Sequence, residues 1–392
     1  MGTTILFIAI LALLVLVHEW GHFIVARKSG MKVYEFGFGF PPRAFGMYKD
    51  PKTGKWVFVK GKGKNTLKET VGGDDRENPD EFPSMLYSFN WLPLGGFVKI
   101  KGENGEEAQD ADSFGAKKFW QKALTLVAGV SMNIILAMVL LSIGFMIGLP
   151  ADTSLLDDPN AIVVEEPAVV AQQIAPDSPA EAAGIAYGDK LVSISGVPVL
   201  TGADLISYVE AHPDEESMLT VLRGKEEVIL ALTPAVLSEE DPTPRLGVIL
   251  ADVGVVRYPW YMAIWKGIMG ALIGAVNIFV AFMLLIKGLV LGQGLAFSVA
   301  GPVGIAVVVG ESARLGAAYL INVMAMLSLS LAVINILPIP ALDGGRLLFV
   351  LIERIFKKPV PLKYEQMAHT LGFLLLMVLI VVVTWRDIVG IL

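Results

Sequence analysis

The chain has 392 residues, of which 54% are hydrophobic and 18% are charged, and its formal net charge is −7. Soluble domains carry about 25% charged residues, so a chain this apolar is expected to lie largely in a membrane. The acidic balance argues against nucleic acid as the main partner. Because the sequence has no cysteine, any metal must be held by histidine and carboxylate side chains.

Four segments are long and apolar enough to cross about 30 Å of hydrocarbon, a distance that takes about 20 helical residues. These predicted spans are residues 5–25, 123–149, 318–337 and 369–383. A fifth stretch, residues 267–286, passes the same hydropathy test. The sequence therefore predicts a polytopic α-helical membrane protein with about four core transmembrane helices.

Lysine and arginine counts predict the sidedness, because cytoplasmic loops carry an excess of basic residues. Residues 27–118 carry 16 basic residues and residues 346–363 carry five, whereas residues 150–258 carry five beside 19 acidic residues. We therefore expect the first two segments to be cytoplasmic, and the acidic middle and both termini to be extracytoplasmic. Residues 258–316 must then cross twice or not at all, and we expect a membrane-associated or re-entrant segment there.

Residues 161–249 have the composition of a soluble domain, with charged, Pro- and Gly-punctuated sequence and short alternating runs such as 190–194. A short helix is predicted at 180–183, ended by Gly184. The run 174–199 resembles the PDZ fold. We expect one extracytoplasmic PDZ (α+β) domain that binds a peptide segment at a sheet edge. The alternative is a spacer or gate that does not recognise substrate.

The motif His18-Glu19-Trp20-Gly21-His22 closes the first predicted span. On a helix, positions i and i+4 lie on one face, so both imidazoles can reach one Zn²⁺ while Glu19 takes a proton from the metal-bound water. Ionisable groups inside a span are costly and usually functional. The motif predicts a catalytic zinc site with one ion per chain.

A catalytic zinc site needs a third protein ligand. His212 and His369 are expected to be structural or interfacial, which leaves carboxylates. Asp343 stands out in the run NILPIPALDGGRLL, because Pro338 and Pro340 prevent a regular helix there and irregular backbone at membrane depth is tolerated where it lines a cavity. The alternative role for Asp343 is a helix N-cap.

Three motifs in this order around a PDZ domain resemble the site-2 protease family of intramembrane zinc metalloproteases, in particular the bacterial branch of PDZ-containing regulators of sigma-E protease. The motifs are HEWGH at 18–22, the GxxxN pattern at 129–133 and the NxxPxPxLDG pattern at 335–344. The resemblance covers nearly the whole chain. It implies His18, His22 and Asp343 as ligands, Glu19 as general base, and a substrate-holding or carbonyl-polarising role for Asn133 and Asn335. Hydrogen bonding between helices is the alternative for both asparagines.

The resemblance extends to two expected strands, at 34–40 and 94–99, the second in a membrane-dipping β-hairpin on the cytoplasmic side. Gly95 and Gly96 on that strand, together with Pro338 and Pro340, are expected to contact an unwound substrate segment. Residues 47–86 depart from the family pattern as an insertion without an assigned role. The single PDZ domain also departs from the enterobacterial type, which carries two.

These predictions divide the chain into seven parts: a first transmembrane helix with HEWGH (1–26), a cytoplasmic-side loop with strands and the insertion (27–121), a second transmembrane helix (122–149), the PDZ domain (161–249), the membrane-associated segment (258–316), a third core helix with the LDGG motif (317–346), and a cytoplasmic loop with the last transmembrane helix (347–392).

The predicted function is a zinc metalloendopeptidase that cuts transmembrane segments of single-pass proteins, such as anti-sigma factors or remnant signal peptides. The expected location is the bacterial cytoplasmic membrane, with the active site toward its cytoplasmic side. Two alternatives remain open at this point. One is an ion- or proton-coupled transporter or channel, and the other is a non-catalytic scaffold that presents a PDZ domain.

Overall fold

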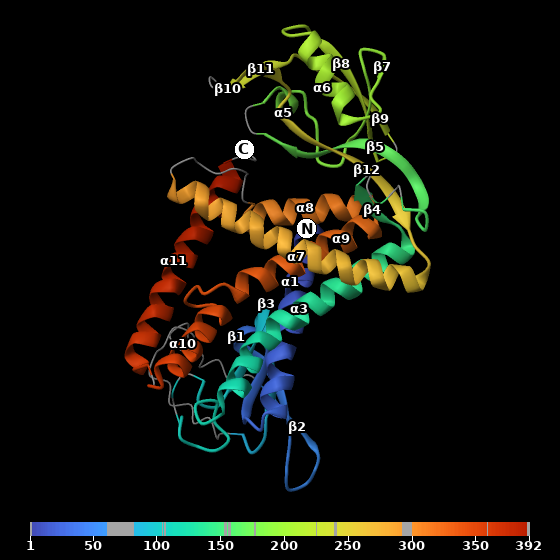
Figure 1. Cartoon of the computed structure of the whole chain (residues 1–392). Helices are drawn as coiled ribbons and strands as arrows, with labels where there is room; N and C mark the ends of the chain where they lie inside the picture. The colour runs from blue at the N-terminus through green and yellow to red at the C-terminus, as the bar shows by residue number, and fades with distance from the viewer. Residues whose placement is uncertain are drawn as a thin grey trace. The chain divides into compact units, whose positions relative to one another are not determined.

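A computed structural model describes residues 2–60, 82–152, 155, 158–238, 241–291, 300–358 and 360–389, apart from residues 104, 106, 176, 177 and 225. The chain forms two compact units (Figure 1). The first consists of Met1–Ala137, Ala271–Val299 and Met326–Val383, and the second of Met138–Gly270, Ala300–Ala325 and Thr384–Leu392.

Five helices of the described chain are long and apolar enough to cross a membrane. They are α1 (Gly2–Lys28), α3 (Phe119–Ile147), α7 (Trp260–Val290), α9 (Ala317–Ile336) and α11 (Leu362–Val389). Four of them match the predicted spans, although α3 ends two residues before the predicted bound 149 and α9 one residue before 337. Helix α7 adds a fifth candidate over the predicted stretch 267–286. How residues 258–316 cross the membrane stays a prediction, since residues 292–299 lie outside the described residues.

Helices α1 and α3 pack against each other in the first unit, where Figure 1 draws them side by side. A Cβ atom added to Gly21 of α1 would lie 2.4 Å from the carbonyl oxygen of Ala128 on α3. Small residues allow such close approach between helices in membranes. The packing brings the HEWGH end of α1 against the middle of α3.

A three-stranded antiparallel sheet in the order β2-β1-β3 belongs to the same unit. Its strands are β1 (Val33–Lys49), β2 (Trp56–Lys60) and β3 (Leu86–Ile100). The predicted strands 34–40 and 94–99 lie within β1 and β3. However, part of the insertion 47–86 belongs to the sheet, because β1 continues to Lys49 and pairs with β2. The sheet thus has one strand more than the predicted hairpin; residues 61–81 lie outside the described residues.

The second unit contains a seven-stranded sheet in the order β4-β12-β5-β6-β8-β9, with β7 paired to β6. Two helices, α5 and α6, accompany the sheet. The elements are β4 (Leu149–Asp152), β5 (Ile162–Ile174), α5 (Pro179–Ala182), β6 (Lys190–Ile194), β7 (Val197–Pro198), α6 (Gly202–Ala211), β8 (Ser217–Arg223), β9 (Glu226–Leu232), the hairpin strands β10 (Ala235–Ser238) and β11 (Asp241–Arg245), and β12 (Val248–Arg257). The sheet extends past both predicted ends of the PDZ domain, because β4 and most of β12 lie outside 161–249.

Residue patterns account for the elements of this module. Ser178 caps α5 by accepting the Glu181 backbone amide, and Thr201 forms a capping box with Asp204 at the start of α6. Both caps follow the side-chain preferences of helix N-termini. The predicted short helix at 180–183 is shifted by one residue from α5, and the predicted strand at 190–194 coincides with β6.

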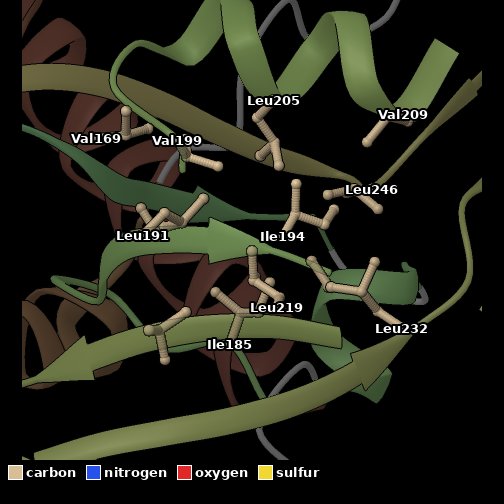
Figure 2. Packing of buried hydrophobic residues seen from close by; sticks show 13 residues of the cluster. Val169, Ile185, Leu191, Ile194, Val199, Leu205, Val209, Leu219, Leu232 and Leu246 are labelled. Atoms are coloured by element: carbon tan, nitrogen blue, oxygen red, sulfur yellow. The ribbon is translucent and has the colours of Figure 1, made fainter. Parts of the chain in front are cut away.

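The core of the module lies between α6 and the strands, as Figure 2 shows. Leu205 and Val209 on α6 point toward Leu191 and Ile194 of β6 and Leu219 of β8. Along β8 the buried and exposed side chains alternate, as expected for a strand with one buried face. Because of this alternation, a buried residue of β8 and its exposed neighbour can be compared in a stability test.

Leu219→Ala should lower the free energy of unfolding of the module by about 2–5 kcal/mol, because it removes a fully buried side chain from a packed core. Its neighbour Met218 is 52% exposed, so Met218→Ala should cost less than about 0.5 kcal/mol. Pulse proteolysis of the detergent-solubilised full chain in urea would measure both. Equal effects of the two substitutions would contradict the assigned strand orientation.

Candidate metal centre

The two histidines of the HEWGH motif lie on one buried face of α1. The His18 and His22 side chains have ring centroids 4.8 Å apart, as the i, i+4 spacing predicts. The residues are 5% and 8% exposed. Burial of two imidazoles on a helix this apolar is costly unless both find polar partners.

Asp343 is the partner that both histidines share, although it lies 325 residues after His18. Its Oδ2 atom is 2.9 Å from Nε2 of His18 and 3.3 Å from Nε2 of His22. The two Nε2 atoms are 3.1 Å apart. Among the described residues these three side chains form the group of histidines and acids that could hold a metal ion.

The donor set and its spacing fit zinc. Two imidazole nitrogens and one carboxylate oxygen are ligands of catalytic zinc sites, which leave a fourth position for water. Ligand atoms of tetrahedral zinc lie about 3.3 Å apart, given metal–ligand bonds of about 2.0–2.1 Å. The three separations are within a few tenths of an ångström of that value, so small side-chain movements suffice.

Helix α3 borders the centre with one residue per turn. Thr125, Gly129 and Asn133 follow one another at intervals of four, so they share a face. The Thr125 carbonyl oxygen accepts a hydrogen bond from Nδ1 of His22 at 2.8 Å. Asn133 contacts Nδ1 of His18 at 3.3 Å. A Cβ at Gly129 would lie 2.4 Å from Nε2 of His22 and 2.6 Å from Nε2 of His18.

Glu19 lies on α1 between the two histidines and faces strand β3. Its carboxylate lies near the backbone amide of Val98. A Cβ at Gly96 would lie 3.7 Å from Cγ of Glu19. The acid therefore lies beside the strand that carries Gly95 and Gly96, and the contact of these two glycines with substrate stays a prediction.

The turn between α9 and α10 (Asp343–Phe356) fixes the carboxylate ligand. Its residue Ala341 has a φ of +81°, a strained backbone conformation for a residue with a Cβ. The Ala341 amide donates to Nδ1 of His369 on α11 at 2.8 Å. A Cβ at Gly344 would lie 2.2 Å from the Leu337 carbonyl oxygen. Gly344 of the LDGG motif is thus required by the close approach of the two backbone segments. His369 accepts the hydrogen bond from Ala341, which fits the structural role predicted for it.

Asp343 does not act as a side-chain helix cap. The N-cap of α10 is Leu342, whose side chain makes no capping hydrogen bond, and Asp343 is the first helical residue. The alternative role from the sequence is therefore wrong, because the carboxylate points to the histidines instead. His212 ends α6 in the second unit, where its ring stacks on Tyr208.

The remaining predicted site residues lie on the segment that leads to Asp343. Asn335 is half-buried in the last turn of α9, and none of the hydrogen bonds among the described residues joins it to the three-residue cluster. Pro338 is exposed and Pro340 half-buried. Gly372 of α11 packs against Pro340, since a Cβ there would lie 2.3 Å from the Pro340 carbonyl oxygen.

Two features of the centre were not predicted from the sequence. The first is the carbonyl of Thr125, which carries no side-chain signal; only its spacing of four from Gly129 points to it. The second is an ion pair between Arg346 and Glu103. It joins α10, one turn after Asp343, to the segment that directly follows β3. No spacing rule links residues 243 positions apart.

The chain is similar to one protein family over nearly its full length. The model of Peptidase family M50 matches residues 6–58 and 81–379. The zinc metalloprotease RasP of Geobacillus kaustophilus is 30% identical, with 97% of this chain and 96% of the relative covered. The regulator of sigma-W protease RasP of Bacillus subtilis is 28% identical, with 99% and 98% covered. The PDZ domain of an SdrC-like protein from Listeria monocytogenes matches 23% of the chain and 93% of its own, at 18% identity and a TM-score of 0.21.

Gly129→Ala should abolish stoichiometric zinc binding, because the new methyl group would overlap both Nε2 ligand atoms. The substitution by itself favours a helix by about 1 kcal/mol, so lost binding would not reflect a weaker helix. Metal content after dialysis against a zinc buffer measures the effect.

Gly270→Ala on α7 is the matched control, since its Cβ would meet Leu141 at an ordinary 3.5 Å. This variant should bind zinc like the unsubstituted chain. Full zinc occupancy in Gly129→Ala would contradict the assigned position of α3 beside the histidines.

Proposed function

The chain belongs to Peptidase family M50, and from this premise we propose that it is a zinc metalloendopeptidase that cuts peptide bonds within transmembrane segments. The observation that carries the proposal is the cluster of His18, His22 and Asp343. These three ligand groups lie among helices apolar enough to cross a membrane. A peptidase centre built there acts on substrates that lie in the membrane as well.

His18, His22 and Asp343 would hold one Zn²⁺ per chain. When bound, zinc lowers the pKa of its water toward about 7 and polarises the carbonyl to be cut. The name of the Geobacillus kaustophilus relative, zinc metalloprotease RasP, supports this choice of metal. The protein's own contribution is the fixed placement of its three ligand atoms, which requires little rearrangement before the metal can enter.

Glu19 is proposed as the general base. One of its carboxylate oxygens takes a proton from the attacking water, and the same group then delivers the proton to the leaving amide nitrogen. The carboxylate lies beside β3, near the Val98 amide and Gly96. Glu19 directly follows His18 and precedes His22 by three residues, so it lies within one helical turn of both.

The substrate is proposed to bind along β3. The first part of this strand, Leu86–Phe89, pairs with β1 on both sides, whereas Gly96–Ile100 pair with β1 on one side. The other edge of Gly96–Ile100 therefore offers backbone groups to an added strand. The edge at Gly96 lies beside Glu19, where a small residue leaves room for a second backbone. A transmembrane helix must first unwind there, because its carbonyls are occupied by internal hydrogen bonds. Asn335, Pro338 and Pro340 are proposed to contact this unwound segment.

Single-pass membrane proteins are the proposed substrates, such as anti-sigma factors already shortened outside the membrane, or remnant signal peptides. The name of the Bacillus subtilis relative, a regulator of sigma-W protease, favours the first class. The basic segments 27–118 and 346–363 support an active site toward the cytoplasmic side of the bacterial membrane. The PDZ-like module and both termini are then extracytoplasmic, and the module would bind a peptide segment of the substrate.

Two other functions make different predictions. An ion-coupled transporter would move ions along its intramembrane acid and histidines and would need no zinc. A scaffold would need only the PDZ-like module. The convergence of two imidazoles and one carboxylate within 4.8 Å of one another favours neither, since a transport path or a scaffold has no need of this ligand set.

Glu19→Gln should reduce cleavage of a transmembrane peptide in detergent by about 10²–10⁴-fold, the usual contribution of a general base. Its zinc content should stay at one per chain, because the glutamine replaces no ligand. Glu210→Gln on the exposed side of α6 is the control and should cleave normally.

Cleavage that persists in Glu19→Gln would exclude the assigned base. Cleavage by the unsubstituted chain that withstands full removal of zinc by a chelator would exclude the metalloprotease itself. Zinc-independent ion flux in liposomes would instead support the transporter.

A further inference from the structure

The two histidine ligands differ in what holds their second ring nitrogen. Nδ1 of His22 faces the backbone carbonyl of Thr125. Nδ1 of His18 faces the side-chain amide of Asn133 at 3.3 Å. Asn133 is 0% exposed, and its Oδ1 atom has no hydrogen-bond partner among the described residues. A buried amide with an unsatisfied oxygen, next to a ligand imidazole, calls for a physical explanation.

Zinc binding through Nε2 of His18 requires one particular orientation of the Asn133 side-chain amide toward Nδ1 of that ring. A carbonyl only accepts hydrogen bonds, so Nδ1 of His22 carries the hydrogen and its Nε2 lone pair is free for zinc. If the Asn133 nitrogen donated to Nδ1 of His18, the hydrogen of that ring would sit on Nε2 and block the ligand atom. A half-turn of the amide exchanges its oxygen and nitrogen, which are nearly equal in shape.

We propose that Asn133 is a positioning residue for the metal, whose Oδ1 accepts the Nδ1–H of His18 and so presents Nε2 of that ring to zinc. The inference rests on the proposed zinc site but not on the identity of the substrate. Ligand histidines almost always donate their other N–H to such a partner, which fixes the tautomer and the ring orientation. Thr125 supplies this partner for His22 from the backbone, and Asn133 supplies it for His18 from a side chain.

The position of Asn133 is itself fixed by the third helix of the centre. The hydroxyl of Ser328 on α9 donates to the Asn133 backbone carbonyl at 2.8 Å, and Ser328 is fully buried. Helix α9 leads into the turn that places Asp343. The same helix pair therefore sets both the carboxylate ligand and the acceptor for His18.

The proposal differs from a substrate-holding role for Asn133 in a measurable way. A residue that only holds substrate changes KM or kcat and leaves zinc affinity unchanged. A residue that orients a ligand changes zinc affinity in the absence of any substrate, typically by about 10–100-fold when it is removed. The test therefore measures zinc binding to the full chain in detergent, by competition with a chelating dye.

Asn133→Leu keeps a similar volume but removes the acceptor, so it should weaken zinc binding by about 10–100-fold. Asn133→Asp keeps the acceptor and should bind zinc within a few-fold of the unsubstituted chain. Ser131→Ala on the same helix is the matched control. Within the described part of the chain its hydroxyl donates to the Val127 carbonyl of its own helix, and the variant should bind zinc normally.

Unchanged zinc affinity in Asn133→Leu with a raised KM would overturn the proposal and make Asn133 a substrate residue. Equal loss in the Leu and Asp variants would also overturn it. If the Leu variant does not fold, ¹⁵N-histidine NMR of the zinc-loaded, unsubstituted protein decides instead: a protonated, slowly exchanging Nδ1 of His18 is expected, and an unprotonated one refutes the proposal. Zinc binding without cleavage would refute the proposed function alone.

Discussion

The structure depends on bringing two imidazoles and one carboxylate together among apolar helices. Each group alone would be costly to bury, and the cost is offset when the groups pair with one another or bind a metal. The histidines come from consecutive turns of α1, but Asp343 comes from 325 residues later in the chain. The close α1–α3 packing at Gly21 and the strained turn at Ala341 are both needed to complete this cluster.

Helix α3 determines how the histidines are presented, although it contributes no ligand. Its backbone carbonyl at Thr125 and its side-chain amide at Asn133 hold one imidazole each. Between them Gly129 leaves the space that both Nε2 atoms occupy. One face of α3 thus carries two residues that contact the imidazoles, with Gly129 between them. Any side chain at Gly129 would overlap the histidine Nε2 atoms. This arrangement explains why a GxxxN pattern belongs in the middle of a span.

The sequence predicted those parts of the site that depend on local periodicity or on unusual residue types. His18 and His22 follow from helical spacing, and Asp343 follows from a carboxylate on irregular backbone near a span end. The sheet was predicted only in part, because β2 and the end of β1 lie within the segment 47–86, whose overall polar, Lys- and Gly-rich composition resembles a loop. The Thr125 carbonyl could not be predicted, since any residue supplies a carbonyl. The positive φ of Ala341 could not be predicted either, since the hydrogen bond to His369 that holds it joins distant segments.

The side from which a substrate reaches the centre follows from what surrounds the ligand atoms. On the α3 side, the backbone at Gly129 approaches both Nε2 atoms so closely that even a methyl group would overlap them. A second polypeptide strand needs about 4.8 Å from its neighbour, so none fits between α3 and the histidines. On the other side, Glu19 lies beside the outer strand β3 at Gly96. The same packing therefore favours both the proposed substrate access along β3 and the proposed orienting role of Asn133.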